Sequence, residues 1–343
     1  MVQENKNIVR IAVDAMGGDF APEYPVLGAI QAAQENKNIE VILVGPEKAI
    51  KEVISKHNVS LSNLKVVNAD EYVTMEDSPA EVYKSKPNSS LNVALRMQRE
   101  KEADALVSAG NTGAVLSHTT LRLGRIEGIG RATIGAEFPS INGATLAFDM
   151  GSTVDCRPSH LVEYAIMGSI FAKNIYKIDN PKIGLLSVGE EKKKGNELTL
   201  AAFELLEKAP INFVGNVEGS DILRGTVDVV ICDGFVGNIV LKMAESVLDL
   251  FRAKLKEYAE KGFFQKIWIG MMRGTLKKIL KKFDYQEHGG TTLLGVNGIS
   301  IIGHGKSTPY AIKVMIYRAE EVSRMKINNK IELAIKENKL INK

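Results

Sequence analysis

The sequence predicts an α/β protein in which two similar halves face each other across a cleft. The first observation is a set of short apolar runs that each end in a glycine-rich polar turn, at residues 8–19, 103–114, 145–155, 182–196, 228–238 and 293–307. Unbroken Val/Ile/Leu runs are typical of buried parallel strands, and ligands bind beyond the carboxyl ends of such strands. Glycine lets the backbone approach a ligand, and amides at a helix start favour anions. The turns therefore indicate an enzyme that handles a phosphate-like group.

The second observation is that helical patterns alternate with these runs. Pro22 and Pro25 mark the start of a first helix, a strand follows near residue 41, and a second helix is expected near residues 47–57. Residues 91–101 predict an amphipathic helix directly before the apolar run near residue 105. This alternation is typical of βαβ units.

The third observation is an internal similarity between the segments that begin at Asp104 and Asp228. In both, glycines fall six and nine residues after the aspartate, and apolar residues then resume. The pattern of strand, glycine turn and helix start therefore occurs twice, which favours two similar α/β halves. We expect residues 1–134 plus 309–343 to form the first domain and residues 135–308 the second, because 343 residues are long for a single core.

Composition limits the class of protein. The formal net charge of +3 and the aromatic content of 6% argue against a nucleic-acid-binding protein. Two cysteines, Cys156 and Cys232, suit a reducing cytosol without a disulfide framework. The amino-terminal residues contain no apolar signal region, and no apolar run approaches the ~18 residues that span a bilayer. We expect a cytoplasmic protein, or one held at a membrane surface.

Several common catalytic motifs are incomplete. Residues 304–307 end like a phosphate-binding P-loop, but Ser300 stands where the first glycine is needed, and residues 128–133 and 303–308 lack the last glycine of a dinucleotide fingerprint. The sequence contains no G-x-S-x-G elbow and no H-E-x-x-H motif, so we expect neither a serine hydrolase nor a catalytic metal. Cys232 ends a strand, and core packing explains it better than a nucleophilic role.

Polar side chains among the glycines are the positive signals. Asn111 and Thr112 stand at a predicted helix start, where capping and donation to an oxyanion are equally good explanations. Lys193 and Lys194 adjoin Gly195 and Asn196, where a solvated charged turn is the simpler explanation.

The segment from His304 to Thr308 adds Lys306 and Ser307, and this dense donor set favours a functional role. Four aspartates end strands or begin turns, and we expect them to orient backbone amides or lysines rather than to react. They are Asp14, Asp19, Asp149 and Asp233.

Residues 261–283 form a separate signal, with seven Lys or Arg and no Asp or Glu. Apolar residues repeat there at helical spacing opposite a basic face, and the only tryptophan lies among them. We favour an interfacial helix at an anionic membrane over a core helix, with an acidic protein partner as a third option. Gly270 and Gly274 are expected to break the segment into two helices. The expected membrane or partner contacts are Phe264, Trp268, Met271, Met272, Leu276, Lys277, Lys278 and Lys281.

Taken together, the motifs resemble the bacterial phosphate acyltransferase family, known as PlsX, from about residue 8 to residue 325. They are IAVDAMGGDFAPE, SAGNTGA, VDCRP, GEEKKKGNE, FVGNVEG, CDGFVGNIVLK, LLGVNG and HGKS. The chain departs from the family pattern at residues 149–153, where D-L-G-A-N is usual, and at residues 304–307, where H-G-S-S is usual.

This resemblance implies that a long-chain fatty acyl group passes from acyl carrier protein to inorganic phosphate, giving acyl phosphate for phospholipid synthesis. It implies a homodimer without a cofactor that associates peripherally with the inner face of the cell membrane. It also implies a three-layer fold with parallel or mixed sheets in two halves, as in phosphotransacetylase and in isocitrate and isopropylmalate dehydrogenases.

The chemistry suits the residues, because phosphate is itself the nucleophile and no serine or cysteine triad is needed. We expect Lys194 and Lys242 to neutralise phosphate, Asn238 and Ser307 to orient it, and His304 to donate to the thioester oxygen or to protonate the leaving thiolate. The remaining predicted phosphate- or substrate-binding residues are Asp14, Gly17, Gly18, Asn111, Thr112, Gly113, Asn196, Asp233 and Gly237.

Three other functions compete with this one. A dehydrogenase of the isocitrate type is possible on the same architecture, although the sequence lacks obvious metal-binding carboxylate clusters. A phosphotransacetylase acting on short acyl-CoA is closer in chemistry, but the basic amphipathic segment favours a lipid substrate. A non-enzymatic membrane adaptor would leave the glycine turns without a purpose.

Overall fold

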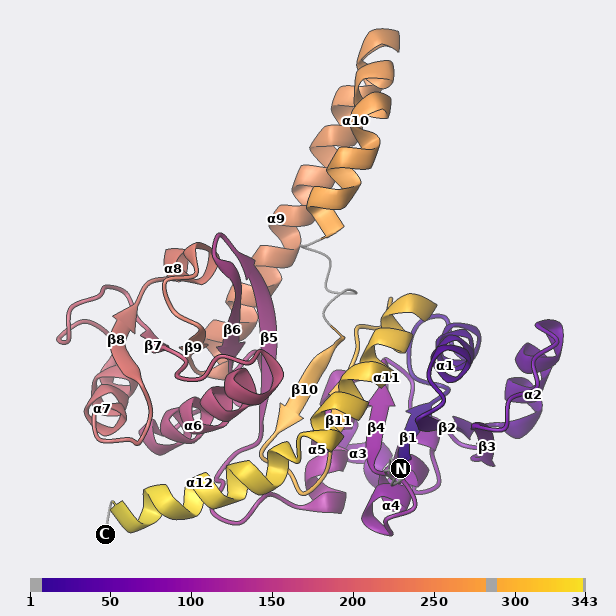
Figure 1. The fold of residues 1–343 in the computed structure, drawn as a ribbon, viewed down its shortest axis with the longest axis horizontal. Helices are drawn as coiled ribbons and strands as arrows, with labels where there is room; N and C mark the ends of the chain where they lie inside the picture. The colour runs from indigo at the N-terminus through magenta and orange to yellow at the C-terminus, as the bar shows by residue number, and fades with distance from the viewer. Residues whose placement is uncertain (1–7, 282–288, 342–343) are drawn as a thin grey trace, which may run out of the picture.

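A single mixed sheet of eleven strands crosses the described part of the molecule, in the order β3-β2-β1-β4-β11-β10-β5-β6-β9-β7-β8 (Figure 1). The computed structural model describes residues 8–281 and 289–341. The strands are β1 (Val9–Asp14), β2 (Ile39–Gly45), β3 (Leu64–Asn68), β4 (Ala105–Ser108), β5 (Thr133–Ser140), β6 (Gly143–Phe148), β7 (Ile183–Leu186), β8 (Phe213–Val217), β9 (Val229–Ile231), β10 (Thr291–Leu294) and β11 (Ser300–Ile302).

Helices cover both faces of this sheet. They are α1 (Glu23–Glu35), α2 (Glu47–Lys56), α3 (Pro79–Ser85), α4 (Ser90–Arg99), α5 (Thr112–Leu123), α6 (Pro158–Ile175), α7 (Glu197–Leu206), α8 (Gly219–Arg224), α9 (Gly234–Glu260), α10 (Phe263–Lys281), α11 (Pro309–Arg324) and α12 (Ile327–Ile341). The helices expected near residues 47–57 and 91–101 are therefore confirmed as α2 and α4.

The layers follow from the alternation of side chains along each buried strand. Ile11 and Val13 of β1 point into the core beneath α1 and α11, whereas Ala12 belongs to the core on the opposite face. In β9, Val230 joins this second core, which extends across both halves of the chain. Because both faces of the strands are buried, apolar residues run without interruption. The predicted α/β fold with a mixed sheet is confirmed.

The middle of the sheet joins two groups of parallel strands that run in opposite directions. β1, β4 and β11 are mutually parallel, β10 is antiparallel to both of its neighbours, and β5 and β6 form an antiparallel hairpin. β6, β9, β7 and β8 are again parallel. The expected boundary between residues 134 and 135 falls inside β5, and β11 pairs with β4 of the first half. The division into domains stays a prediction.

Asp104 and Asp228 form equivalent hydrogen bonds in the two halves of the chain. Each precedes a strand, and each accepts a hydrogen bond from a backbone amide at the neighbouring strand: Arg10 N at 2.8 Å and Lys182 N at 2.7 Å. In return, the amides of both aspartates donate to the carbonyl oxygens of the same two residues. The internal similarity of the sequence is therefore a real similarity of local structure.

Helices α9 and α10 form a hairpin that projects away from the sheet (Figure 1). The expected break at Gly270 and Gly274 is wrong, because α10 is one helix from Phe263 to Lys281. A glycine inside a helix costs only about 1 kcal/mol relative to alanine, which is too little to break a helix that packs along a partner. Among the described residues, no helix is both long enough and apolar enough to cross a membrane.

Candidate active site

The first group of predicted site residues gathers where the neighbouring strands β1, β4 and β11 end. Asp14, the last residue of β1, is almost fully buried. Its carboxylate accepts hydrogen bonds from Ser90 Oγ at 2.6 Å, Ser108 Oγ at 2.8 Å and Met16 N at 3.2 Å. Ser108 Oγ in turn accepts from Gly110 N at 3.1 Å. A single carboxylate thus holds two glycine turns and the start of α4 together.

Gly17 and Gly18 allow the two turns to approach each other closely. A Cβ on Gly17 would lie 2.7 Å from Ser108 Oγ and 2.9 Å from the backbone nitrogen of Gly110. Gly18 has a φ of +117°, which L side chains rarely adopt, and Asp19 N donates to Gly305 O at 2.8 Å. Glycine is therefore needed at both positions, because it lets the backbones of these turns pack directly against each other.

Asn111 caps α5 and anchors a loop. Its Oδ1 accepts from Ala114 N at 3.1 Å, which confirms the capping alternative, and its Nδ2 donates to the carbonyl oxygens of Met75 and Asp77, both at 3.1 Å. Both amide hydrogens are used in this way, so the side chain has none left for a substrate. Thr112 and Gly113 form the exposed first turn of α5, whose backbone amides suit an anion.

The segment from Gly303 to Thr308 lies against this group. Gly303 N donates to Ser108 O at 2.8 Å, and Ser307 is buried, with its amide donating to His304 O at 2.8 Å. His304 is exposed, and its Nδ1 accepts from Lys306 N at 3.3 Å, so the neutral ring carries its proton on Nε2. Thr308 caps α11 by accepting from Ala311 N.

The second group lies at the ends of β6 and β9. Asp149 is fully buried and accepts from Ser152 N at 3.0 Å, Ser152 Oγ at 2.6 Å and Thr153 N at 2.8 Å. Asp233 caps α9 by accepting from Val236 N at 2.9 Å. These bonds confirm that the aspartates orient backbone amides.

Gly237 and Asn238 follow in the first turns of α9, close to the Asp149 turn. A Cβ on Gly237 would lie 1.9 Å from Asp149 O, so only glycine lets the helix approach this turn. Asn238 is exposed, and a Cβ on Gly151 would lie 3.4 Å from its Oδ1. Asn238 therefore stands directly beside the Asp149 turn.

The third group follows β7. Asn196 caps α7 by accepting from Thr199 N at 2.9 Å, and Lys194 is exposed on the turn before it. The carbonyl oxygen of Lys194 accepts from Ser187 Oγ at 3.1 Å, which fixes the turn. Lys242 lies on α9, one turn beyond Asn238, and pairs with Glu245 at 3.4 Å. Convergence of the three groups on one cleft stays a prediction.

Burial sets the protonation behaviour of the acidic groups. Burial raises the pKa of Asp14, although hydrogen bonds from Ser90, Ser108 and Met16 oppose this effect, and burial likewise raises the pKa of Asp149. The pKa of the Cys232 thiol is raised well above its usual value by burial, and that of Cys156 is also raised. Neither thiol is thus suited to act as a thiolate nucleophile.

Sequence analysis missed Ser90 and Ser108, which complete the Asp14 site. Ser108 stands inside the SAGN turn, so its polar side chain at a strand end was an available signal. Ser90 lies 76 positions from Asp14 in the chain, and no local pattern connects them. Across the described residues, no group of three His, Cys, Asp or Glu side chains could hold a metal ion.

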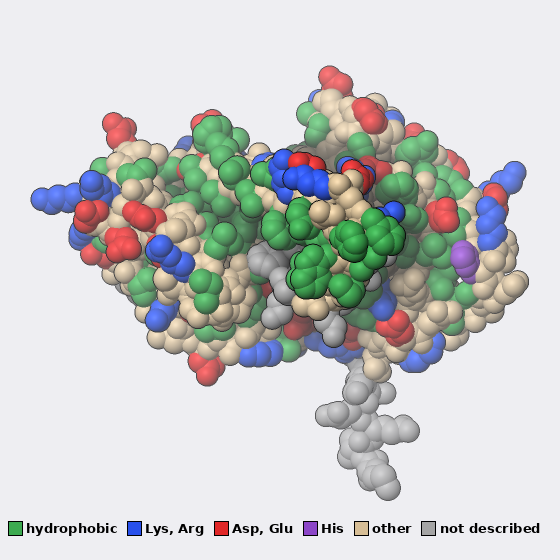
Figure 2. Space-filling model, turned by 90° about the horizontal axis from the view of Figure 1, so that it is seen from above, with side chains coloured by type: hydrophobic (Ala, Val, Ile, Leu, Met, Phe, Trp, Pro, Cys, Tyr) green, Lys and Arg blue, Asp and Glu red, His purple; other side chains and the backbone are tan. Residues whose placement is uncertain are grey.

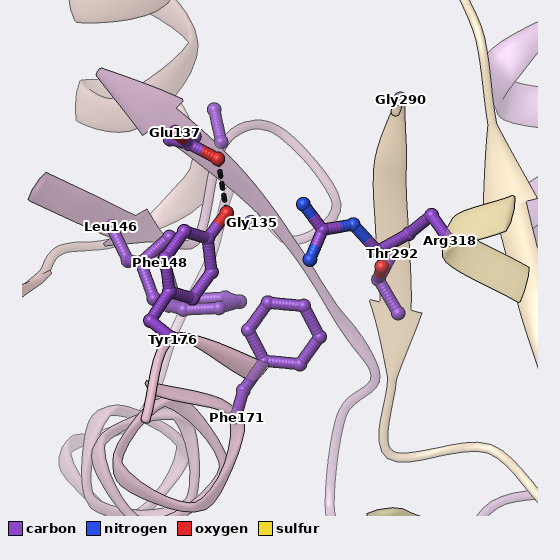
Figure 3. A pocket seen from close by; sticks show the side chains of 10 residues that line it. Gly135, Glu137, Leu146, Phe148, Phe171, Tyr176, Gly290, Thr292 and Arg318 are labelled. Carbon is purple, nitrogen blue, oxygen red and sulfur yellow. Dashed lines mark hydrogen bonds between the residues drawn. The ribbon is translucent and has the colours of Figure 1, made fainter. Parts of the chain in front are cut away.

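A small pocket of about 20 Å³ lies elsewhere, between β5, β10, α6 and α11 (Figure 3). Tyr176 donates a hydrogen bond to Glu137 there, and the Arg318 guanidinium lies 5.4 Å from the centre of the Tyr176 ring. None of the predicted site residues lines this pocket. It lies where Arg318 of α11 meets Tyr176, the residue that follows α6.

Comparison with known proteins defines the class. The EutD phosphotransacetylase from Staphylococcus aureus superposes with a TM-score of 0.59 at 15% identity, covering 94% of each chain. A phosphotransacetylase from Streptococcus pyogenes gives 0.57 at 18% identity, covering 96% of each chain. The fold is thus the α/β fold of phosphotransacetylases, with anion-suited glycine turns at its strand ends.

Sequence relatives identify the family. A family model described as "Fatty acid synthesis protein" matches residues 9–330. A phosphate acyltransferase from Endomicrobium trichonymphae is 45% identical over 95% of this chain and 97% of its own length. Another, from Desulfitobacterium hafniense, is 48% identical over 91% of this chain and 93% of its own. The chain belongs to the phosphate acyltransferase family.

The raised pKa of Asp14 predicts a particular pH dependence of stability. The native state binds more protons than the unfolded state between the unfolded pKa of about 3.9 and the higher native pKa, so this group's contribution to stability falls as pH rises through that window. We expect Asp14→Asn to lose this part of the dependence, measured by urea unfolding at a series of pH values. An unchanged pH profile in Asp14→Asn would show that the native pKa is not raised.

Proposed function

We propose that this chain transfers a long-chain fatty acyl group from acyl carrier protein to inorganic phosphate, giving acyl phosphate for phospholipid synthesis. The observation that carries the proposal is the identity of 43–48% to curated phosphate acyltransferases over more than nine-tenths of the chain. The turns at the strand ends would supply the positioning that such a reaction needs.

In the proposed reaction, a phosphate oxygen attacks the thioester carbon. A carbon–oxygen bond forms, the carbon–sulfur bond breaks, and the departing thiolate takes up a proton. Positioning two reactants supplies ~7–11 kcal/mol of the barrier, and each donor to the developing oxyanion contributes roughly 3–4 kcal/mol. The work of the protein is then to hold an anion beside a thioester, and it needs no nucleophilic side chain.

Each predicted site residue has its own role in binding phosphate or in donating a proton. Lys194 and Lys242 would neutralise the phosphate, while Asn238 and Ser307 would orient it. His304 would donate its Nε2 proton to the thioester oxygen or to the leaving sulfur, because its Nδ1 accepts from the Lys306 amide. The amides of the first turn of α5 would add further donors to an anion.

The proposed reaction cannot proceed without phosphate. Thiol release from palmitoyl-acyl carrier protein should occur only when inorganic phosphate is present, with acyl phosphate trapped as hydroxamate. His304→Ala should lower kcat by about 100-fold, the usual contribution of a positioned proton donor. Palmitoyl-CoA and acetyl-CoA, tested alongside, identify the preferred donor.

Other outcomes would contradict the proposal. Release without phosphate would indicate a thioesterase, and preference for acetyl-CoA would indicate a short-chain phosphotransacetylase. No release, with carrier protein and lipid supplied, would leave the dehydrogenase alternative. Unchanged activity of His304→Ala would remove His304 from the scheme.

We also propose that the tip of the α9–α10 hairpin docks on an anionic membrane surface. Figure 2 looks down on this tip, where hydrophobic side chains gather beside Lys and Arg. The side chains exposed by 43–81% along α10 are Phe263, Phe264, Ile267, Trp268, Met271 and Met272. Exposed aromatic and Met side chains in a helix with basic residues are typical of interfacial binding. The side chains of Lys277, Lys278 and Lys281 lie outside the described residues, and Leu276 is half-buried.

Trp268 makes this second proposal testable, because it is the only tryptophan of the chain. Vesicles that contain anionic lipid should shift its fluorescence to the blue, and vesicles of purely zwitterionic lipid should do so much less, because each basic residue adds about 1 kcal/mol near anionic lipid. Phe264→Glu should weaken the binding. A shift produced by acyl carrier protein alone would assign the segment to the protein partner instead.

The homodimer and the cytoplasmic location at the inner membrane face stay predictions. α9 offers apolar surface to a partner, since Phe235, Ile239, Met243 and Val247 are each more than half exposed at a spacing of four residues. At this spacing, the four side chains follow one face of the helix.

A further inference from the structure

A large apolar side chain, that of Met75, borders the turn that carries His304 and Ser307. A Cβ placed on Gly305 would lie 3.1 Å from Met75 Cε and 2.6 Å from Asp19 Oδ1, so both neighbours approach the same point. Met75 is 42% exposed. Apolar surface thus lies open to solvent directly beside the polar turn.

Met75 lies on a loop that is fixed at several points. Asn111 Nδ2 donates to the carbonyl oxygens of Met75 and Asp77. The Asp77 carboxylate accepts from Thr74 N at 2.8 Å and from Lys86 Nζ at 2.6 Å, and this ammonium lowers the pKa of Asp77, so the ion pair persists at neutral pH. The loop is therefore a fixed wall of the site.

The far end of the loop is anchored by a buried histidine. His118 Nε2 lies 3.0 Å from Pro79 O, and the ring is inaccessible to solvent. Burial lowers the pKa of His118, so its neutral ring donates from Nε2 to the carbonyl. A Cβ on Gly113 would approach within 3.0 Å of Pro79 Cγ, so the loop also packs tightly against the start of α5.

We propose that Met75 is a specificity-determining residue that contacts the acyl chain just beyond the thioester, and that Asn111 is the positioning residue that holds it there. This inference rests on the proposed function. An acyl thioester presents a polar carbonyl followed by an apolar chain, and the polar Gly305 turn with the exposed Met75 side chain beside it presents the same order of surfaces. Methionine suits this position because its unbranched thioether adapts to a flexible chain.

Met75→Ala tests the specificity contact. We expect kcat/KM for palmitoyl-acyl carrier protein to fall about tenfold, the usual effect of a lost apolar contact. The value for butyryl-acyl carrier protein, whose chain has little to place against Met75, should stay within about twofold. Met75→Leu, which conserves volume, should keep the wild-type ratio, and so should Leu333→Ala, an exposed apolar control on α12.

Asn111→Ser tests the positioning role. The serine hydroxyl keeps a cap on α5 and adds no charge beside the first turn of this helix, but both hydrogen bonds to the loop are lost. KM for the palmitoyl donor should rise while KM for phosphate is unchanged, and discrimination between the two donors should fall as in Met75→Ala. A loss of about 100-fold in kcat with both donors would instead identify Asn111 as an oxyanion donor and overturn the positioning role.

The activity of the wild-type protein distinguishes failure of the proposed function from failure of the proposed Met75 contact. The proposed function itself is contradicted if the wild-type protein releases thiol without phosphate, or releases no thiol at all. With wild-type activity present, an equal change for both donors in Met75→Ala, or no change, overturns the specificity contact. Thermal unfolding identifies any variant that fails to fold. If Met75→Ala fails to fold, Met75→Trp, which narrows the space for the acyl chain without opening a cavity, allows the same comparison of the palmitoyl and butyryl donors.

Discussion

The geometry of the site depends on two carboxylates buried at strand ends. Asp14 and Asp149 each accept hydrogen bonds from three close donors, which are backbone amides and serine hydroxyls. These bonds hold the two turns in one conformation. A buried carboxylate is costly unless such donors satisfy it, so the donors must be in place whenever the protein is folded. The same device appears in both halves of the chain and fixes the backbone before any ligand arrives.

This arrangement suits a reaction in which both reactants come from solution. Backbone amides and small side chains form the surface, and the two cysteines are made unreactive because burial raises their pKa values. In the proposed reaction, catalysis would consist of orientation and charge stabilisation, which preformed turns can supply without reorganisation. In our proposal, the exposed Met75 side chain beside the first group adds an apolar surface for the acyl chain of the donor.

Local structure was predictable from the sequence because it depends on short patterns. Apolar runs ending in glycine turns marked β1, β4, β6, β7 and β9, and the Asp104 and Asp228 segments proved to have matching hydrogen bonds. The basic amphipathic segment at residues 261–283 was recognisable as helical. The expected break at Gly270 and Gly274 was wrong because it overestimated the free-energy cost of glycine in a packed helix.

Long-range features were not predictable in this way. Strand order in the middle of the sheet depends on pairing between β10 and β5, more than 150 residues apart in the chain, and no local pattern specifies it. The partner of Asn111 was likewise hidden, because the loop that it holds lies 34–36 residues earlier. Spacing alone made capping and donation to an oxyanion equally good explanations for Asn111. The structure shows the cap, and it shows that Met75 O and Asp77 O accept both amide hydrogens.

The most direct test of the central claim, that phosphate itself attacks the thioester, is to mix the protein with palmitoyl-acyl carrier protein in the absence of phosphate. Thiol release is followed by rapid quench, and the protein is then weighed intact by mass spectrometry. Direct attack predicts no burst of thiol and an unchanged protein mass until phosphate is added. A stoichiometric burst with a protein heavier by one palmitoyl group would contradict it, because the acyl group would then pass through a side chain.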